Sequence, residues 1–321
     1  MSRNMPVPTA EQSDLAAMLD AVMSDVHALP SDEQPTEVAG LRRRLAELGV
    51  WTLGVDEKLG GGGADDALAA TAFARLSRKW AALGWAAVQA HAAAEVLGGN
   101  PDLRSRVHTG EIAVAVTQGE RIDAAAEAPH VIVLAEDCAT LFTPESLRYR
   151  PLRRTGLDGA LTRTVEVVGD GVPLVADVPA ALVRLRLGAA AVAAGIADAA
   201  AEAAFNYSAT RKQFGNVLTA LPTVRESLLS SSGAAASLLR QVQHSASATP
   251  WQAAAVLDAA CESAIDAAAG AVQSHGGYGY LTEYPVERLL RDAVSLRAAC
   301  DSTSVRRSGA LDLARSAKGS A

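Results

Sequence analysis

Residues 187–204 read LGAAAVAAGIADAAAEAA, and this stretch decides the fold class. Alanine has the highest intrinsic helix propensity, and its small side chain lets neighbouring helices approach closely. Asp198 and Glu202 interrupt the run, so a membrane span, which needs about 18 or more apolar residues without charges, is not expected. The stretch therefore predicts a long buried helix in a mainly helical protein.

Helical periodicity continues on both sides of this stretch. Beyond Pro179 it runs to the end of the chain, with breaks at Leu221-Pro222 and Thr249-Pro250 and a loose tail after Arg315. In the N-terminal part, prolines and glycines separate three helical segments: Glu11 to His27, Glu37 to Leu48, and Asp65 to Leu97. Both ends of the chain are therefore predicted to be helical.

The period changes between Glu111 and Val178, where short β-branched runs alternate with turn residues. Strands are expected at Ile112 to Val116, Val131 to Leu134, Thr164 to Val168 and Val172 to Val175. The predicted fold is mainly α with a small central β domain. Its parts are an N-terminal helical domain (residues 1–110), a β domain (111–178) and a C-terminal four-helix-type bundle (179–321).

Composition excludes several classes of protein. With 321 residues, 49% of them hydrophobic, the chain can bury a large core. The net charge of −7 argues against a nucleic-acid partner, because no basic stripe is available to neutralise phosphates. The run Arg42-Arg43-Arg44 is expected to form a solvated helix face.

The cysteines and the N-terminus indicate a cytoplasmic protein without a metal centre. Cys138, Cys261 and Cys300 are widely spaced, and no CxxC pair is present to bind a metal or form a redox couple. Three unpaired thiols suit a reducing compartment. The segment from Met1 to Asp14 is polar and has no apolar signal core.

Two motifs carry chemistry. Residues 207–215 read YSATRKQFG, and residues 273–280 read QSHGGYGY. Arg211 offers a planar, permanently charged fork that suits a pyrophosphate, while Gly276 and Gly277 let backbone amides approach phosphate or ribose oxygens. Alternatively, the arginine caps a helix end and the glycines only stop a helix.

Both motifs resemble the C-terminal signatures of acyl-CoA dehydrogenases, and Leu45 to Gly49 resembles the family's N-terminal domain. The resemblance implies the helix–β–helix fold and FAD as cofactor. It also implies that FAD held mainly by a neighbouring subunit is contacted by Arg211, Gln213, Phe214, Gln273, Gly276 and Gly277. Arg186 matches an arginine near the acyl-CoA, although Arg184 on the same helix could be mistaken for it.

The chain departs from the family where the reaction is carried out. The family's glutamate base, which removes a proton next to the thioester carbonyl, falls on Cys300 in one known location and on Leu185 in the other. A thiol is not a substitute base unless something favours its ionisation. Of the family's loop and strand that wrap the flavin ring, only Val116-Thr117-Gln118-Gly119 is found, and no tryptophan lies between Trp85 and Trp251.

This asymmetry predicts a shared active site. A homologous partner subunit in an α2β2 tetramer is expected to supply the base and the flavin-ring pocket, while this chain completes the partner's FAD site. The resemblance implies a bulky, steroid-derived CoA thioester as substrate and an electron-transfer flavoprotein as acceptor. Two alternatives stay open: a self-sufficient homotetramer that uses Asp301 as base, and a structural or regulatory subunit that does not bind FAD.

Overall fold

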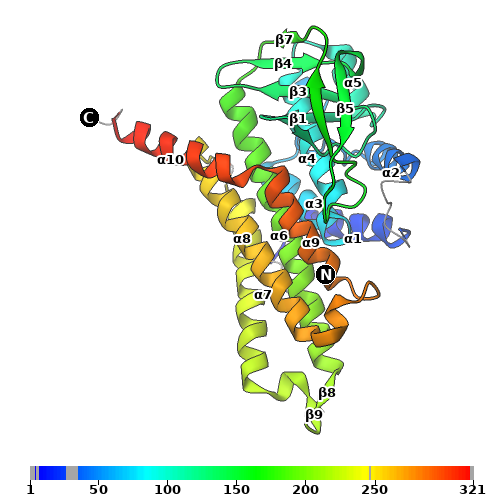
Figure 1. Ribbon diagram of the computed structural model, residues 1–321, viewed down its shortest axis with the longest axis vertical. Coiled ribbons are helices and arrows are strands. Elements are labelled where there is room, and N and C mark those ends of the chain that lie inside the picture. Colours follow the sequence, from blue (N-terminus) through cyan, green and yellow to red (C-terminus); the bar gives the residue numbers. More distant parts are fainter. Residues whose placement is uncertain (1–3, 5–6, 27–34, 246, 319–321) are drawn as a thin grey trace.

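The computed structural model describes residues 4, 7–26, 35–245 and 247–318 (Figure 1). A helical domain is followed by a small β domain and a bundle of long helices, which confirms the fold class expected from the sequence. His27 and Pro30, where the first predicted helix ends and breaks, lie outside the described residues.

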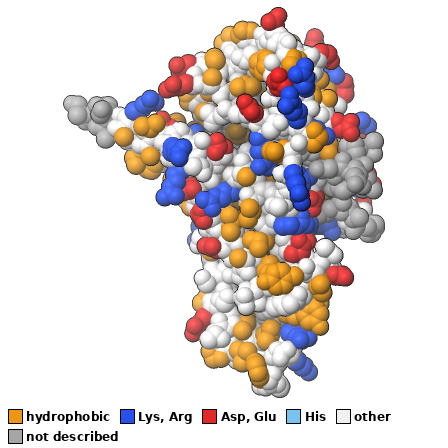
Figure 2. All heavy atoms as spheres, viewed as in Figure 1, with side chains coloured by type: hydrophobic (Ala, Val, Ile, Leu, Met, Phe, Trp, Pro, Cys, Tyr) orange, Lys and Arg blue, Asp and Glu red, His pale blue; other side chains and the backbone are white. Residues whose placement is uncertain are grey.

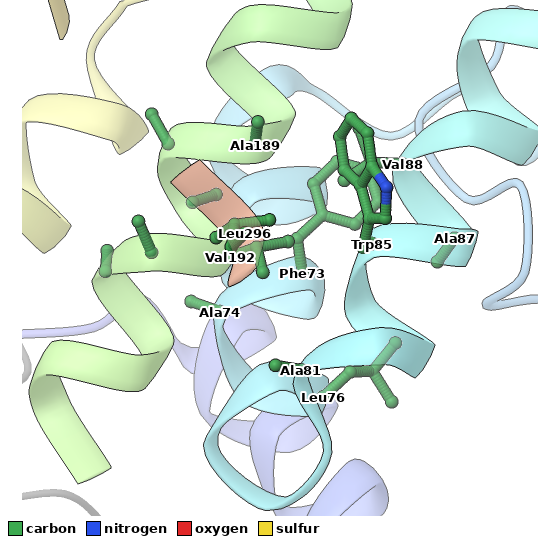
Figure 3. Packing of buried hydrophobic residues seen from close by; sticks show 14 of the residues in the cluster. Phe73, Ala74, Leu76, Ala81, Trp85, Ala87, Val88, Ala189, Val192 and Leu296 are labelled. Carbon is green, nitrogen blue, oxygen red and sulfur yellow. The ribbon is translucent and has the colours of Figure 1, made fainter. Parts of the chain in front are cut away.

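The alanine-rich stretch forms the centre of α6 (Val178–Thr210), which runs the length of the molecule (Figure 1). Small residues on several sides of this helix are fully buried, as at Ala190, Ala191 and Ala193. They allow close packing against α3 (Asp66–Lys79), α4 (Ala81–Val96) and α8 (Pro250–His275). Figure 3 shows Phe73, Trp85 and Val88 of the N-terminal domain facing Ala189 and Val192 of α6.

The two acids within α6 have a partner in the N-terminal domain. Arg78 of α3 forms ion pairs with both Asp198 and Glu202. Asp198 is almost fully buried, and a buried carboxylate is tolerated only when it is paired. Among the described helices α6 alone is long and apolar enough to cross a membrane by length and composition, and most of that apolar window is buried inside the protein.

The remaining N-terminal helices are α1 (Ala10–Ser24), α2 (Pro35–Glu47) and α5 (Pro101–His108), with a short 3-10 turn, η1 (Glu57–Leu59). The prediction of a solvated arginine face on α2 is wrong for Arg42. That side chain is buried, and its Nε donates to the Gly110 carbonyl at 2.7 Å. Burial lowers the pKa of Arg42 to about 10.

The β domain consists of two small sheets. One has the order β1-β3-β4-β7 and the other β2-β6-β5. Only the β1–β3 pair is parallel. The strands are β1 (Val114–Thr117), β2 (Arg121–Ile122), β3 (His130–Leu134), β4 (Ala139–Phe142), β5 (Leu147–Pro151), β6 (Arg163–Val167) and β7 (Val172–Leu174), with η2 (Pro144–Ser146) before β5.

The C-terminal part surrounds α6 with further helices. A small hairpin, β8 (Lys212–Gln213) and β9 (Asn216–Val217), follows α6 directly and lies at the far end of the molecule from the β domain (Figure 1). The other elements are η3 (Leu218–Ala220), α7 (Pro222–Gln243), η4 (Gly276–Tyr280), α9 (Val286–Ala299) and α10 (Ser302–Lys318). The prediction of a loose tail after Arg315 is wrong up to Lys318, because α10 continues to that residue and projects from the bundle (Figure 1).

Candidate functional site

A cavity of about 460 Å³, here called the cleft, lies where the β domain meets α4, α6 and the α9–α10 junction. Its walls come from several separate parts of the chain. The turn from Thr117 to Asp123 forms one side, Trp85 and Gln89 of α4 form another, and the N-terminal half of α6 faces them. The fold therefore brings the β domain and the bundle together around one site.

The two positions at which the sequence resemblance places the base both lie in this cleft. Leu185 lines it from α6, and Cys300, the residue that ends α9, lines it from the opposite direction. Burial raises the pKa of the Cys300 thiol well above its ordinary value, and the nearby Cys261 and Asp123 add to the shift. Cys300 is therefore a protonated thiol at neutral pH, and it is a poor proton acceptor.

Asp301 also lines the cleft, in a strained conformation with a φ of 44°. Its Oδ1 accepts a hydrogen bond from the Ser304 amide at 3.4 Å, and α10 begins at the next residue. An aspartate in this position caps the helix that follows. The residue is exposed to solvent, and its carboxylate is engaged at the start of α10.

Arg186 lies in the cleft, whereas Arg184 does not. The Arg186 side chain is buried, and its guanidinium donates to the Pro250 carbonyl at 3.2 Å and to the Ser308 hydroxyl at 3.1 Å. Its Nε has no partner among the described residues, and burial lowers its pKa. This buried cation is hydrogen-bonded to neutral groups, with Asp312 as a nearby opposite charge, and it can still interact with an electron-rich group in the cleft.

A polar network that sequence reasoning missed supports the Thr117–Asp123 turn. Gln89 donates to the Asp123 carbonyl at 2.8 Å and accepts from the Val116 amide at 3.2 Å. Arg121 holds the buried Asp123 carboxylate with two hydrogen bonds, at 2.8 and 3.1 Å, and Thr162 adds a third. The available signal was a glutamine within a largely apolar, alanine-rich helix, because buried polar groups need partners.

The two motifs meet at a second, more open site, here called the outer groove, with a volume of about 440 Å³. Arg211 directly follows α6 and lies 5.4 Å from the centre of the Tyr278 ring. The groove is also lined by Gln213, Gln273, Gly276 and Gly277. Phe214 is not part of it; this residue turns the β8–β9 hairpin with a φ of 52° and is 88% exposed.

The geometry of the outer groove fits the pyrophosphate of a dinucleotide. Gly276 ends α8 with a φ of 58°, and a Cβ at Gly276 or Gly277 would meet no atom within 4 Å. The backbone is thus open on its outer side, where an anion can approach the amides and the Arg211 guanidinium. Arg211 and Gly276 end helices, as one of the two alternatives from the sequence expected, and both also line this groove.

The cleft and the outer groove lie at opposite ends of α6. About 25 residues separate Arg186 from Arg211, and a helix rises about 1.5 Å per residue, so the two lie about 37 Å apart. Figure 1 shows the β domain at one end of the molecule and the β8–β9 hairpin at the other. One dinucleotide cannot contact both sites of the same chain.

The surface around the outer groove is rich in exposed apolar side chains. Tyr280 is 78% exposed and Tyr278 43%, in addition to Phe214. Figure 2 shows hydrophobic side chains over this lower end of the molecule. Within the described part of the chain, no group of three or more metal-ligating side chains is present.

Comparison with known proteins identifies the family. The model "Acyl-CoA dehydrogenase, N-terminal domain" matches residues 9–109, and "Acyl-CoA dehydrogenase, C-terminal domain" matches residues 175–306. A curated acyl-CoA dehydrogenase of Bacillus subtilis (strain 168) is 40% identical over 114 residues, which are 34% of this chain. The sequence match spans only 30% of the length of that relative.

Solved structures show the same fold. An acyl-CoA dehydrogenase from Bacillus anthracis complexed with FAD has a TM-score of 0.81 at 19% identity, covering 99% of this chain and 69% of that chain. The ChsE4-ChsE5 complex from Mycobacterium tuberculosis has a TM-score of 0.77 at 20% identity, covering 96% and 98%. The steroid ACAD Tcur3481-Tcur3483, as its G363A variant, has a TM-score of 0.73 at 20% identity, covering 95% and 99%.

The two matched regions together include most of the chain, and they flank the β domain in the order that the structure shows. Their agreement with the fold and with both sequence motifs leaves one conclusion: this chain belongs to the acyl-CoA dehydrogenase family.

Proposed function

We propose that this chain is the non-catalytic, FAD-completing subunit of a heteromeric acyl-CoA dehydrogenase. A homologous partner supplies the carboxylate base and the flavin-ring pocket, and the complex desaturates a CoA thioester between its α and β carbons. Bound FAD supplies the acceptor for the hydride that leaves the β carbon. The base, which must remove the α proton, belongs to the partner.

The outer groove carries this proposal. It holds Arg211, Gln213 and the two glycines about 37 Å from the chain's own cleft, at the end of a helix and on an open surface. Groups placed there can act on a cofactor only across an interface. The exposed aromatic side chains beside the groove supply apolar area for such an interface.

The residues of the cleft support the assignment of proton removal to the partner subunit. Its two family base positions hold Leu185 and a protonated Cys300 thiol, so neither accepts the substrate proton at neutral pH. Arg186 remains in the cleft as a buried cation beside these positions. We assign to it a contact with the thioester end of a bound acyl-CoA, in which the guanidinium donates to an oxygen of the ligand.

The substrate and the assembly belong to the same proposal. Two of the proteins with a similar fold are the ChsE4-ChsE5 complex and the steroid ACAD Tcur3481-Tcur3483. Their names support the proposal of an α2β2 tetramer that acts on a steroid-derived CoA thioester. An electron-transfer flavoprotein is proposed as the acceptor, and the cytoplasm as the location. The free thiols of Cys138, Cys261 and Cys300 fit a reducing compartment.

The test is a measurement of flavin per chain. The chain is purified alone and co-expressed with a homologous partner, and flavin absorbance and assembly mass are recorded for both preparations. Flavin that appears only in the mixed tetramer, at about one FAD per pair of chains, is the expected result. A homotetramer of this chain that binds FAD and is reduced by an acyl-CoA contradicts the proposal.

The self-sufficient alternative rests on Asp301, the carboxylate next to the family position. Asparagine at this position keeps a capping oxygen and tolerates the positive φ, but it cannot accept a proton. If Asp301 is the base, Asp301→Asn lowers kcat by roughly 10² to 10⁴. Under our proposal the turnover of the mixed complex stays within about twofold of the wild-type value. Asp301→Gly, which accommodates the positive φ but lacks a capping oxygen, shows the effect of losing the cap.

A further inference from the structure

A third cavity, here called the α3 cavity, lies on the opposite side of α6 from the cleft and has a volume of about 390 Å³. Leu185, Arg186 and Ala189 face the cleft, whereas Arg184, Leu187 and Gly188 face the α3 cavity. With 3.6 residues per turn, these two sets lie on opposite sides of the helix. The α3 cavity is therefore separate from the cleft and from the outer groove.

The inner walls of the α3 cavity are apolar. Ala69, Ala70 and Phe73 of α3 face Val88 of α4 and Leu187 of α6. The volume is in the range of sites that hold small molecules, and such sites are mostly apolar with a few polar groups at defined places. Each square ångström of hydrocarbon transferred from water to these walls contributes about 25 cal/mol.

One polar side chain in the wall, His91, is uncharged and fully engaged. Its Nδ1 donates to the Ala87 carbonyl at 2.8 Å, which leaves Nε2 to accept from the Gly54 amide at 3.1 Å. Burial lowers the pKa of His91 to about 4, so the ring is neutral at pH 7. The wall therefore offers no cation to an anionic ligand.

The rim has an excess of acids. Asp66 and Asp177 lie at the mouth, and the single guanidinium there, Arg184, is already paired with Glu95 at 2.8 Å and with Asp66 at 3.4 Å. The pKa of Glu95 is raised to about 7, mainly by burial; Arg184 opposes this shift, and repulsion from Asp66 and Asp56 adds to it. Asp66 and Asp177 each use Oδ1, for Arg184 and for the Ala180 amide, whereas their Oδ2 atoms accept no hydrogen bond from the described residues.

We propose that the α3 cavity binds a small, mostly hydrocarbon molecule that presents a hydroxyl or ammonium group to the acidic rim. The hydrocarbon part fills the space between α3, α4 and α6, and the donor hydrogen-bonds to the carboxylates of Asp66 and Asp177. A carboxylate ligand of the same length is disfavoured, because it meets like charges and a guanidinium that is already paired. This site does not depend on the proposed role of the chain in FAD binding.

Three probes with one chain length test the proposal: octan-1-ol, octylammonium and octanoate. Each is titrated into the full chain carrying labelled methyl groups, and chemical shifts are followed at Val88 and Leu187 in the α3 cavity and at Leu185 and Leu257 in the cleft. The alcohol and the ammonium are expected to shift the first pair and leave the second unchanged. Octanoate is expected to bind at least about tenfold more weakly.

Variants that place a larger side chain in the α3 cavity test whether the probes bind there. Ala70→Leu occupies the inner space, and Ala180→Leu narrows the exposed mouth with less risk to the core. Both are expected to weaken octan-1-ol binding at least about tenfold, whereas Ala298→Leu, which fills part of the cleft, leaves it unchanged. The proposal is overturned if octanoate binds as tightly as octan-1-ol, if no probe shifts Val88 and Leu187, or if both filling variants bind like the wild type.

Discussion

Arg184 and Arg186 are two residues apart in the sequence, yet they lie on opposite sides of α6 and line different cavities. Arg184 is half-exposed and paired with the carboxylates of Glu95 and Asp66. Arg186 is buried and held by a carbonyl and a hydroxyl, with no carboxylate within ion-pair distance among the described residues. The ambiguity between them in the sequence is therefore resolved in favour of Arg186 as the arginine of the cleft.

The first prediction follows from this difference. Arg186→Gln removes a buried charge without a carboxylate partner, so the free energy of unfolding is expected to stay the same or rise by about 1–2 kcal/mol. Stabilisation of the mixed complex by butyryl-CoA, measured as a thermal shift, is expected to be reduced but not abolished, because the partner's own substrate site still binds the ligand. Arg184→Gln breaks partly exposed ion pairs; it is expected to lower stability by about 0.5–1 kcal/mol and to keep the butyryl-CoA shift.

A loss of more than about 2 kcal/mol of stability in Arg186→Gln contradicts this prediction, because it shows that the guanidinium is needed for folding. An unchanged butyryl-CoA shift in that variant contradicts the assigned contact with ligand.

The second prediction concerns the outer groove. Arg211→Ala removes a charge-assisted contact with the cofactor, and such contacts contribute about 1.5–3 kcal/mol. FAD is therefore expected to dissociate from the mixed tetramer roughly 10 to 150 times more readily, as measured by equilibrium dialysis. Lys212→Ala is the matched control, because this neighbouring cation does not line the groove.

Full retention of FAD by the Arg211→Ala complex favours the structural or regulatory alternative. Equal loss in both variants indicates a general effect of positive charge and contradicts the specific contact.

The sequence alone predicted most of the helices, but it did not predict which side chains lie where the helices pack against one another. The alanine-rich stretch predicted α6, and the helical period around it predicted the order of the parts. Strands β2, β4 and β5 were missed. β2 and β4 are short, with two and four residues, and β5, LRYRP, alternates between apolar and polar residues but carries two arginines and ends in proline. Proline argues against a strand in the interior of a sheet.

For the candidate site, the sequence predicted which residues share a region but not what surrounds each of them. Gln213, Gln273 and the glycines line one groove, as the motifs indicated, whereas Phe214 points away from it. The burial of Arg42 depends on the Gly110 carbonyl, which lies far away in the sequence. The α3 cavity likewise depends on how α3, α4 and α6 are spaced, and a single sequence does not encode that spacing in any local pattern.

The third prediction tests the close packing of α6 against α3. A Cβ at Gly195 would lie 2.2 Å from the Ala74 carbonyl oxygen, so Gly195→Ala forces the two helices apart. The variant is expected to lose about 1–3 kcal/mol of stability even though alanine favours helix. Gly233→Ala in α7 has open space around the new methyl group and is expected to gain about 0.5–1 kcal/mol. Urea denaturation midpoints distinguish the two, and a gain in stability at Gly195 contradicts the packing described here.

The fourth prediction concerns His91, whose buried ring has a pKa lowered to about 4. Its unfolded form takes up a proton near pH 6.5, so the folded state is fully favoured above that pH and loses stability as the pH falls towards 4. The loss is on the order of 3 kcal/mol, since a shift of one pKa unit corresponds to about 1.36 kcal/mol.

Glutamine cannot titrate, so His91→Gln is expected to be less stable than the wild type at pH 7, and this difference in stability is expected to shrink by about 3 kcal/mol at pH 4. Urea denaturation of both proteins at intervals between these pH values measures the difference, in which contributions from the other histidines cancel. A difference that stays constant with pH shows that His91 does not titrate as its buried, doubly hydrogen-bonded position requires.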